Sequence, residues 1–328
     1  MSAKRKTSGA RSPRNRKAKA ERGERSPADP SAEELAQGEA GRVVAHHGVA
    51  VLVRFDAGGE RQIWLTPDQR AVAGDRVVVI KDRLFVETAH GVLRRLDARG
   101  RERTIATNLD VLGIVVAIEP REPPGYIDRG FVIARAAEIE PILIVNKVDL
   151  DGASELAETL VGIYGTSSAV LRTSASTGEG IEAISESLAG GKIGALVGPS
   201  GVGKSSLLNT LVPDLDLRVS ELNRGSRKGR HTTTTATLHD LSGGGLLVDT
   251  AGFKDFIAVD VDSLEAAAFF PGFEACADEG CRFRNCLHRT EPGCSILAAV
   301  EAGEISAGRH RAYVRLLEEL AEPSRRSR

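Results

Sequence analysis

The stretch Gly198-Pro-Ser-Gly-Val-Gly-Lys-Ser205 fits the phosphate-loop pattern G-x-x-x-x-G-K-[ST]. An apolar run of strand character, 193–197, precedes it, and residues 205–212 have helical spacing. In such a loop, successive backbone N–H groups and the positive end of the helix hold phosphate, and side chains in the loop would block its approach. The stretch therefore predicts an α/β P-loop domain that binds a nucleoside triphosphate.

Two residues of this loop have individual roles. Lys204 is expected to reach the β- and γ-phosphates and to take part in catalysis, and the Ser205 hydroxyl is expected to ligate Mg²⁺. We expect the loop and the residue after it to contact the nucleotide through Gly198, Pro199, Ser200, Gly201, Val202, Gly203, Lys204, Ser205 and Ser206.

A base-reading motif, Asn146-Lys-Val-Asp149, lies upstream of the P-loop. The Asp149 carboxylate can accept hydrogen bonds from N1–H and the exocyclic amino group of guanine, which adenine cannot offer. Asn146 is expected to bond the base edge and tie this loop to the P-loop, while the stem of Lys147 lies over the ring. The backbone at Ser174 and Ala175 is expected to meet guanine O6. Because an unbonded polar edge costs about 1–3 kcal/mol, the site predicts GTP rather than ATP.

The stretch Asp249-Thr-Ala-Gly252, at the end of a predicted strand, completes the expected nucleotide site. Its carboxylate is expected to hold Mg²⁺ through water, and the Gly252 N–H is expected to meet the γ-phosphate. Thr232 or Thr233, in a polar and basic loop, is expected to close over Mg²⁺. The sequence does not choose between these two threonines.

A glutamine usually follows this motif and orients the attacking water. Here Phe253 occupies that position and cannot do so. Arg230 and His231 are the nearby polar candidates, and His231 can orient or deprotonate water, although a purely structural role stays open. We therefore expect slow intrinsic hydrolysis, with His231, Lys204 and Thr233 as the catalytic residues.

The order of the motifs is unusual. Most GTPases begin with the P-loop and continue through the switch threonine and DxxG to NKxD and Ser-Ala. Here NKxD and Ser-Ala come first, and no second NKxD follows Gly252. The order predicts a circular permutation in which the same pocket forms in space. The segment after DxxG leads into the C-terminal part, so the state of the γ-phosphate could move that part.

Composition and hydrophobic pattern divide the 328 residues into four parts. Residues 1–40 predict a disordered basic tail, either a plain solvated segment or an arm for nucleic-acid phosphates. Residues 41–100 predict an OB-type β-barrel, 101–265 the permuted GTPase domain and 266–328 a zinc-binding helical module. Barrel strands are expected at 42–55, 61–65, 76–81, 84–86 and 91–96, followed by a charged linker at 97–107.

The GTPase part alternates strands and helices, which is typical of a parallel sheet covered on both faces. Strands are expected at 111–118, 141–145, 169–171 and 193–197, and helices at 127–139, 152–164, 180–188 and 205–212. A hairpin is expected at 238–241 and 245–248, and a C-terminal helix at 309–320.

Composition limits the class of function. The chain has no run of about 18 apolar residues and no apolar signal segment, so we expect a cytoplasmic protein without a membrane contact. Aromatic residues make up 4%, which argues against stacking on exposed bases as the main binding device. Nothing in the sequence suggests a dimer, and we expect a monomer.

All four cysteines lie between Cys276 and Cys294, and in a cytosolic protein this clustering favours a metal over disulfides. Thiolates and an imidazole in this number suit one structural Zn²⁺ in a closed tetrahedral site. We favour Cys281, Cys286, His288 and Cys294 as ligands, although spacing alone leaves Cys276 as a fifth candidate. An added basic face is expected from Arg282, Arg284 and Arg289.

Together the motifs resemble a bacterial family, the circularly permuted ribosome small subunit-dependent GTPase A proteins, over about residues 41–320. The resemblance rests on Arg101-Glu-Arg-Thr, Asn146-Lys-Val-Asp149, Gly198–Ser205, Gly229-Arg-His-Thr-Thr-Thr234, Asp249-Thr-Ala-Gly-Phe253 and Cys281-x4-Cys-x-His-x5-Cys294. It implies an OB barrel, a permuted GTPase domain and a zinc-containing helical module. It also implies that His231 is the family's switch-loop histidine, that Phe253 is its hydrophobic residue after DxxG, and that Cys276 is not a ligand.

Two functional hypotheses follow. The resemblance implies a GTPase that binds the small (30S) ribosomal subunit late in maturation, through 16S rRNA and nearby ribosomal proteins, hydrolyses GTP there and then leaves. The alternative is a nucleotide-dependent switch that binds a protein partner, with incidental hydrolysis. Salt separates them, because binding to RNA falls steeply with added salt and an apolar protein interface does not.

Overall fold

The computed structural model describes residues 30–97, 101–212, 215, 236–249, 261–277 and 280–321. The chain divides into two units, up to Gly38 and from Glu39 onward. In the first unit, α1 (Ala32–Ala36) occupies part of the segment predicted as a disordered tail. A capping box between Ser31 and Glu34 begins this helix. The basic residues of the predicted tail lie outside the described residues.

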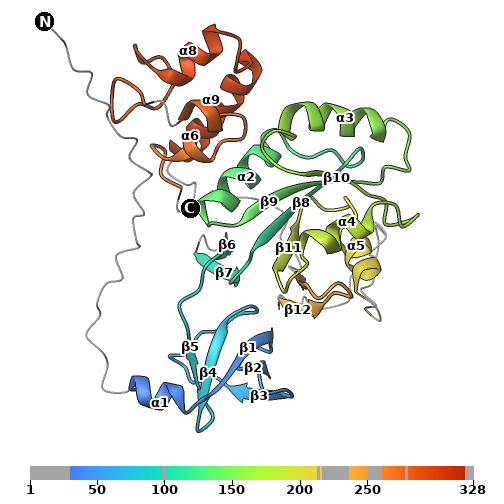
Figure 1. The fold of residues 1–328 in the computed structure, drawn as a ribbon, viewed down its shortest axis with the longest axis vertical. Helices are drawn as coiled ribbons and strands as arrows, with labels where there is room; N and C mark the ends of the chain where they lie inside the picture. Colours follow the sequence, from blue (N-terminus) through green and yellow to red (C-terminus); the bar gives the residue numbers. More distant parts are fainter. Residues whose placement is uncertain are drawn as a thin grey trace, which may run out of the picture. The chain divides into compact units, whose positions relative to one another are not determined.

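A parallel sheet forms the centre of the second unit (Figure 1). In order across the sheet, its strands are β10 (Val170–Arg172), β9 (Glu140–Asn146), β8 (Val111–Ala117), β11 (Ile193–Val197) and β13 (Leu246–Asp249). β12 (Thr237–Asp240) pairs antiparallel with β13, which confirms the predicted hairpin. Because parallel strands end at one edge, the segments after β9, β8 and β11 emerge beside one another, and Asp249 at the end of β13 lies at the same edge.

Helices cover both faces of this sheet, as the sequence predicts. They are α2 (Tyr126–Ala136), α3 (Ala153–Tyr164), α4 (Ile181–Ser187) and α5 (Lys204–Leu211). On β8, Leu112 and Ile114 belong to the core shared with α2 and α3, while Val111 and Val115 belong to the core shared with α4 and α5. All residues of β8 are buried, so its continuous apolar run reflects burial on two faces.

Antiparallel strands precede this sheet in the order β3-β2-β1-β4-β5. They are β1 (Glu39–His46), β2 (Ala50–Phe55), β3 (Glu60–Trp64), β4 (Arg76–Ile80) and β5 (Arg83–Val86). The run expected as one strand at 42–55 is a hairpin, with Gly48 at a φ of 75° in its turn. No ladder joins β3 to β5 among the described residues, so closure into an OB-type barrel stays a prediction.

The expected linker at 97–107 was wrong. β7 (Glu102–Ala106) lies within it and pairs with β6 (Leu93–Leu96). We expected residues 91–96 to form a strand of the barrel, but β6 and β7 form a separate two-stranded sheet. The charged residues Glu102 and Arg103 of β7 are compatible with a strand because they are exposed, and Arg103 donates a hydrogen bond to Asp97 at 3.1 Å.

β1 joins the antiparallel strands β2 to β5 to the parallel sheet. Residues 39–42 pair with β4, whereas Ala45 pairs with Thr237 of β12. The pairing of β1 with β2 shifts register between Val43 and Ala45. Because successive side chains of a strand point to opposite faces, Val43 packs in the core among the strands β1 to β5 and Val44 in the core of the parallel sheet.

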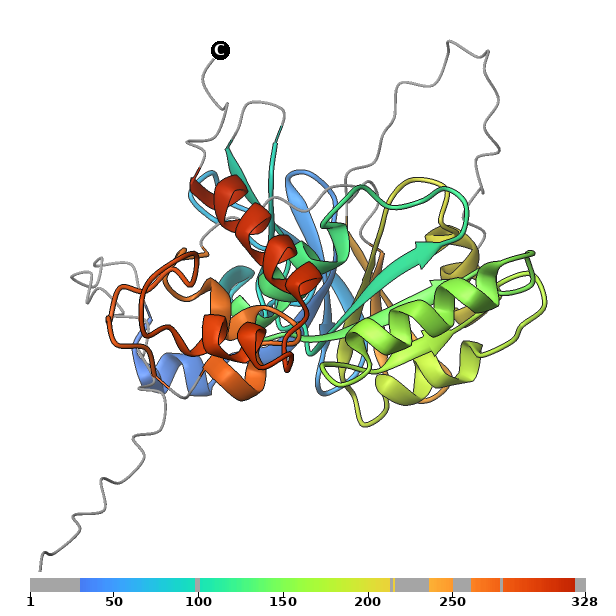
Figure 2. The same ribbon diagram turned by 90° about the horizontal axis from the view of Figure 1, so that it is seen from above.

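The C-terminal part packs on α2 through α9 (Ala307–Ala321), shown red beside α2 in Figure 2. The Arg309 guanidinium donates to Asp128 on α2 at 2.8 Å, and it lies 4.5 Å from the ring centre of Phe270 and 5.1 Å from that of Tyr164. α6 (Ala266–Phe269) also packs on α2, and the remaining helices of this part are α7 (Glu274–Ala277) and α8 (Ser295–Glu301). None of the described helices is long and apolar enough to cross a membrane.

We expect Arg309→Met to destabilise the protein by about 3–5 kcal/mol, because it leaves the buried Asp128 carboxylate without its cation. Arg129→Met is the matched control. It breaks the other ion pair between α2 and α9, whose Glu319 side chain is 50% exposed, and should cost about 1 kcal/mol or less. Chemical denaturation followed by circular dichroism measures both changes. Equal losses would contradict the greater weight of the buried pair.

Candidate nucleotide site and metal centre

Asn146, the last residue of β9, joins three loops at the edge of the sheet. Its side chain amide donates to the carbonyl of Val202 in the P-loop at 2.8 Å. Its Oδ1 accepts hydrogen bonds from the hydroxyl of Thr173 and the backbone N–H of Ala175, each at 3.3 Å. Asn146 is 1% exposed, so its amide is used mainly in holding the base-reading loop, the P-loop and the Ser-Ala loop together.

Two of the P-loop glycines are required because other parts of the protein approach them closely. A Cβ on Gly198 would lie 2.4 Å from the carbonyl oxygen of Val115 in β8. A Cβ on Gly203 would lie 2.3 Å from Nδ2 of Asn146, and the φ of Gly203 is 99°. The sequence predicts these glycines from the approach of phosphate. The structure adds the close approach of β8 and of the base-reading loop.

Lys204 begins α5 and curls back over the P-loop. Its Nζ donates to the carbonyls of Gly198 at 2.6 Å and Pro199 at 2.8 Å. Ser205 is exposed in the first turn of α5, and Ser206 is half-buried there. The start of this helix therefore offers a cation, a hydroxyl and backbone N–H groups at one place, which suits an anionic ligand.

Asp249 ends β13, the strand beside the P-loop strand β11. Burial raises the pKa of Asp249, while the charges of His239 and Lys204 act in the opposite direction. Asp249 therefore lies within the electrostatic field of the P-loop lysine. A half-buried carboxylate at this position suits a cation held near bound phosphates.

Asp149 is exposed at the rim of the same edge. Its carboxylate accepts a hydrogen bond from the Ser174 hydroxyl, and this bond is the main cause that lowers the pKa of Asp149. The group is therefore an ionised acceptor at neutral pH. The sequence assigns only backbone contacts at Ser174; its hydroxyl, which orients Asp149, was not predicted.

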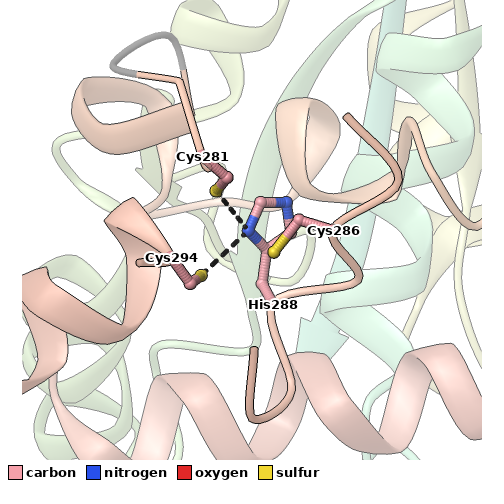
Figure 3. A group of neighbouring side chains, drawn as sticks. All are labelled: Cys281, Cys286, His288 and Cys294. Atoms are coloured by element: carbon pink, nitrogen blue, oxygen red, sulfur yellow. Dashed lines mark hydrogen bonds between the residues drawn. The ribbon is translucent and has the colours of Figure 1, made fainter. Parts of the chain in front are cut away.

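A second cluster lies in the C-terminal part, between α7 and α8. The ligand atoms of Cys281, Cys286, His288 and Cys294 all lie within 4.8 Å of one another. In Figure 3 their side chains converge, and Nδ1 of His288 is 3.4 Å from Sγ of Cys281 and 3.3 Å from Sγ of Cys294. Three sulfur donors and one imidazole nitrogen fit Zn²⁺. Cys276 is buried but lies outside this cluster.

Polar groups around the cluster fix its loop. Burial alone would raise the pKa of Glu291, but its carboxylate accepts hydrogen bonds from backbone N–H groups of the same loop, which hold the pKa at about 2. The distance from the backbone nitrogen to a carboxylate oxygen of Glu291 is 3.0 Å for Leu287, 2.7 Å for Arg289 and 3.0 Å for Thr290. The N–H of Ser295 donates to Sγ of Cys281 at 3.4 Å. Such contacts orient metal ligands. Glu291 was not predicted, although a carboxylate between two candidate ligands is a usable signal.

Comparison with known proteins decides the family. The family model for RsgA GTPase matches residues 86–258. The chain belongs to the RsgA GTPase family. It is 39% identical over 262 residues to the small ribosomal subunit biogenesis GTPase RsgA of Gemmatimonas aurantiaca, covering 76% of this chain and 85% of that one. The protein of the same name from Thermotoga maritima is 38% identical, with 85% and 96% covered.

Solved structures agree with this assignment. The crystal structure of YjeQ from Thermotoga maritima is 33% identical, covers 86% of this chain and 98% of that one, and has a TM-score of 0.69. YloQ, a circularly permuted GTPase, is 24% identical, covers 89% and 98%, and has a TM-score of 0.65, which shows the shared fold. The predicted permutation and GTP-hydrolysing activity are thereby confirmed, and the RsgA GTPase family implies binding of GTP and Mg²⁺.

Part of the predicted site lies outside the described residues. This holds for the candidate catalytic residue His231 and its neighbour Arg230, and for Thr232, Thr233, Gly252 and Phe253. The structure brings together the other predicted nucleotide contacts at the edge formed by β9, β8, β11 and β13. Asn146 and the P-loop supply the direct contacts between them.

We expect Cys286→Ser to lose zinc, because three donors hold the ion less tightly than four. Cys276→Ser is the control, since it removes a buried thiol that lies outside the cluster. Elemental analysis after dialysis against a mild chelator should find about one zinc per chain in the wild type and the control. Retention of zinc by Cys286→Ser, or its equal loss from both variants, would contradict the ligand set.

Proposed function

We propose that this chain is a GTPase that binds the small ribosomal subunit in the cytoplasm and hydrolyses GTP during its late maturation. The observation that carries the nucleotide assignment is the joining of three loops by Asn146, beside the exposed acceptor Asp149. The names of the relatives, small ribosomal subunit biogenesis GTPase, support the choice of partner.

The P-loop contributes charge and N–H groups to the phosphates. Lys204 holds two carbonyls of its own loop, and in the proposed complex its ammonium exchanges them for β- and γ-phosphate oxygens. The N–H groups from Gly198 to Ser206 cradle the same phosphates. Asp149 accepts from guanine, with Lys147 over the ring and the Ser174 and Ala175 backbone at O6.

Ser205 and Asp249 are proposed to hold Mg²⁺, which when bound neutralises charge on the β- and γ-phosphates. Thr232 or Thr233 and the N–H of Gly252 are proposed to close the site, and His231 to orient or deprotonate the attacking water. Phe253 cannot perform that task, which supports a slow enzyme that the ribosomal subunit stimulates.

Three features support binding to RNA. In the proposed barrel domain (41–100), Trp64 is 66% exposed, and a cavity of about 720 Å³ lies between the β1–β2 turn, the segment from Leu65 to Val72 and β7. In the proposed zinc module (266–328), Phe283 is 42% exposed between the exposed Arg282 and Arg284. Exposed aromatic and cationic groups are suited to bases and phosphates. The basic residues of the proposed tail (1–40) lie outside the described residues, and their positive charge in the sequence is the third feature that favours RNA.

The zinc module is proposed to hold one structural Zn²⁺, since its four donors leave no open position for a substrate. Its role is to fix the loop that carries Phe283 and the neighbouring arginines. Residues 101–265 are proposed to form the GTPase domain. The whole chain is proposed to act as a monomer, with 16S rRNA and nearby ribosomal proteins as contacts.

Asp149→Asn should reduce the affinity for GTP by about 1–3 kcal/mol, because an amide presents a donor toward the donor edge of guanine. The affinity for xanthosine triphosphate should rise, because that base carries a carbonyl where guanine carries an amino group. Competition binding against fluorescent GDP measures both changes. A preference for GTP that survives the substitution would falsify the base-reading assignment.

Turnover of GTP by the purified chain, with and without small ribosomal subunits, tests the proposed partner. We expect strong stimulation at low salt and much less at moderate salt, because contacts with RNA phosphates release counterions. Lys204→Ala should show no turnover, which excludes a contaminating enzyme. Unstimulated turnover with normal GTP binding would instead favour the nucleotide-dependent switch that binds a protein partner.

A further inference from the structure

The segment after β8 meets the base-reading loop. β8 lies between β9 and β11 in the sheet, so Glu119 emerges between the base-reading motif and the P-loop. The ammonium of Lys147 donates to the backbone carbonyl of Glu119 at 2.9 Å. The residue expected to cover the guanine ring is therefore anchored at its far end to another loop.

The next residue, Pro120, lies against the P-loop. A Cβ on Gly201 would be 3.3 Å from Cδ and 3.4 Å from Cγ of Pro120. Lys147 itself lies near another residue of this loop, since a Cβ on Gly203 would be 4.0 Å from Cε of Lys147. The Glu119 carbonyl therefore contacts the lysine, and the Pro120 ring faces Gly201 of the P-loop.

We infer that Glu119 and Pro120 are positioning residues of the guanine-nucleotide site, an inference that rests on the proposed function. The Glu119 carbonyl fixes the Lys147 ammonium, and the Pro120 ring fixes the carbonyl by packing on the P-loop. A lysine stem has much rotamer freedom, and anchoring its end orders it before the base arrives. The segment acts on the base through Lys147.

This arrangement predicts a loss of affinity without a loss of turnover. Contacts to the base are the same in the ground state and the transition state, so their loss raises KM and leaves kcat unchanged. A merely structural role for Pro120 would instead lower the fraction of folded enzyme, and with it the apparent kcat.

Pro120→Gly and Pro123→Gly form a matched pair in one loop. Pro123 is exposed, and the role of its carbonyl as acceptor for the Tyr126 N–H is retained by glycine. Both substitutions replace proline by glycine, so they raise the conformational entropy of the unfolded chain by the same kind of change. We expect Pro120→Gly to bind fluorescent GDP about tenfold more weakly than wild type, about 1.4 kcal/mol. Its kcat at saturating GTP should be unchanged, and Pro123→Gly should match the wild type in both quantities.

A double substitution tests the route through Lys147. Lys147→Met keeps an apolar stem and removes the ammonium, so adding Pro120→Gly to it should weaken binding by less than about twofold. Equal binding by the two proline variants, or a full additional loss in the Lys147→Met background, would overturn the inference while GTP binding by the wild type stands. A wild-type chain that binds no guanine nucleotide would overturn the proposed function itself, and the inference with it. Thermal unfolding of each variant confirms that it is folded at the assay temperature.

Discussion

The parallel pairing of β8 with β9 on one side and β11 on the other is the constraint on which the nucleotide site depends. It sets the carboxyl ends of these strands at one edge whatever the order of the strands in the chain. The base-reading loop follows β9 and the P-loop follows β11. A permuted chain can therefore build the same pocket, because pairing between strands replaces adjacency in sequence.

The contacts across this edge are tight and mutually dependent. Asn146 can reach Val202 only because Gly203 leaves room beside its amide. Gly198 in turn allows the P-loop to approach the Val115 carbonyl in β8. A side chain at Gly203 would separate loops that Asn146 holds together, and a side chain at Gly198 would push the P-loop away from β8. These glycines therefore shape the site before any phosphate is bound, and the loops need little rearrangement when the nucleotide arrives.

The sequence predicted most of the GTPase core and less of what surrounds it. The β8 run and the P-loop signal are local patterns, and their strands and helices form close to the expected bounds. β7 was missed because its charged residues suggest solvent, whereas pairing with β6 stabilises it. The helix α1 that begins at the Ser31 capping box was missed, because composition alone placed residues 1–40 in a disordered tail. The contact of Lys147 with the Glu119 carbonyl leaves no trace in the sequence, because any residue can offer a carbonyl. The Cys/His cluster could be expected from the sequence because thiols and imidazole are distinctive, but Glu291 acts through backbone N–H groups that carry no residue identity.

The attachment of the C-terminal part bears on the idea that the γ-phosphate moves it. Arg309 and Asp128 join α9 to α2, with side chains only 16% and 7% exposed. A motion of this part must carry α2 with it or break a buried pair, at a cost of about 3–5 kcal/mol. A ligand must favour one of two conformations by about 5.5 kcal/mol to move the protein almost completely from the other conformation into it. Breaking the pair would therefore use most of that differential binding energy. The barrel strands are attached differently, through the Ala45–Thr237 pairing of β1 with β12 and the exposed ion pair of Arg54 with Asp240. β12 is also the partner of β13, whose last residue is Asp249. The barrel strands are thus one strand away from the proposed Mg²⁺ ligand, and Val44 of β1 packs in the same buried core as Leu238 of β12. Their attachment therefore combines an exposed ion pair with buried apolar contacts, so a shift of these strands against the parallel sheet would also expose apolar surface to water.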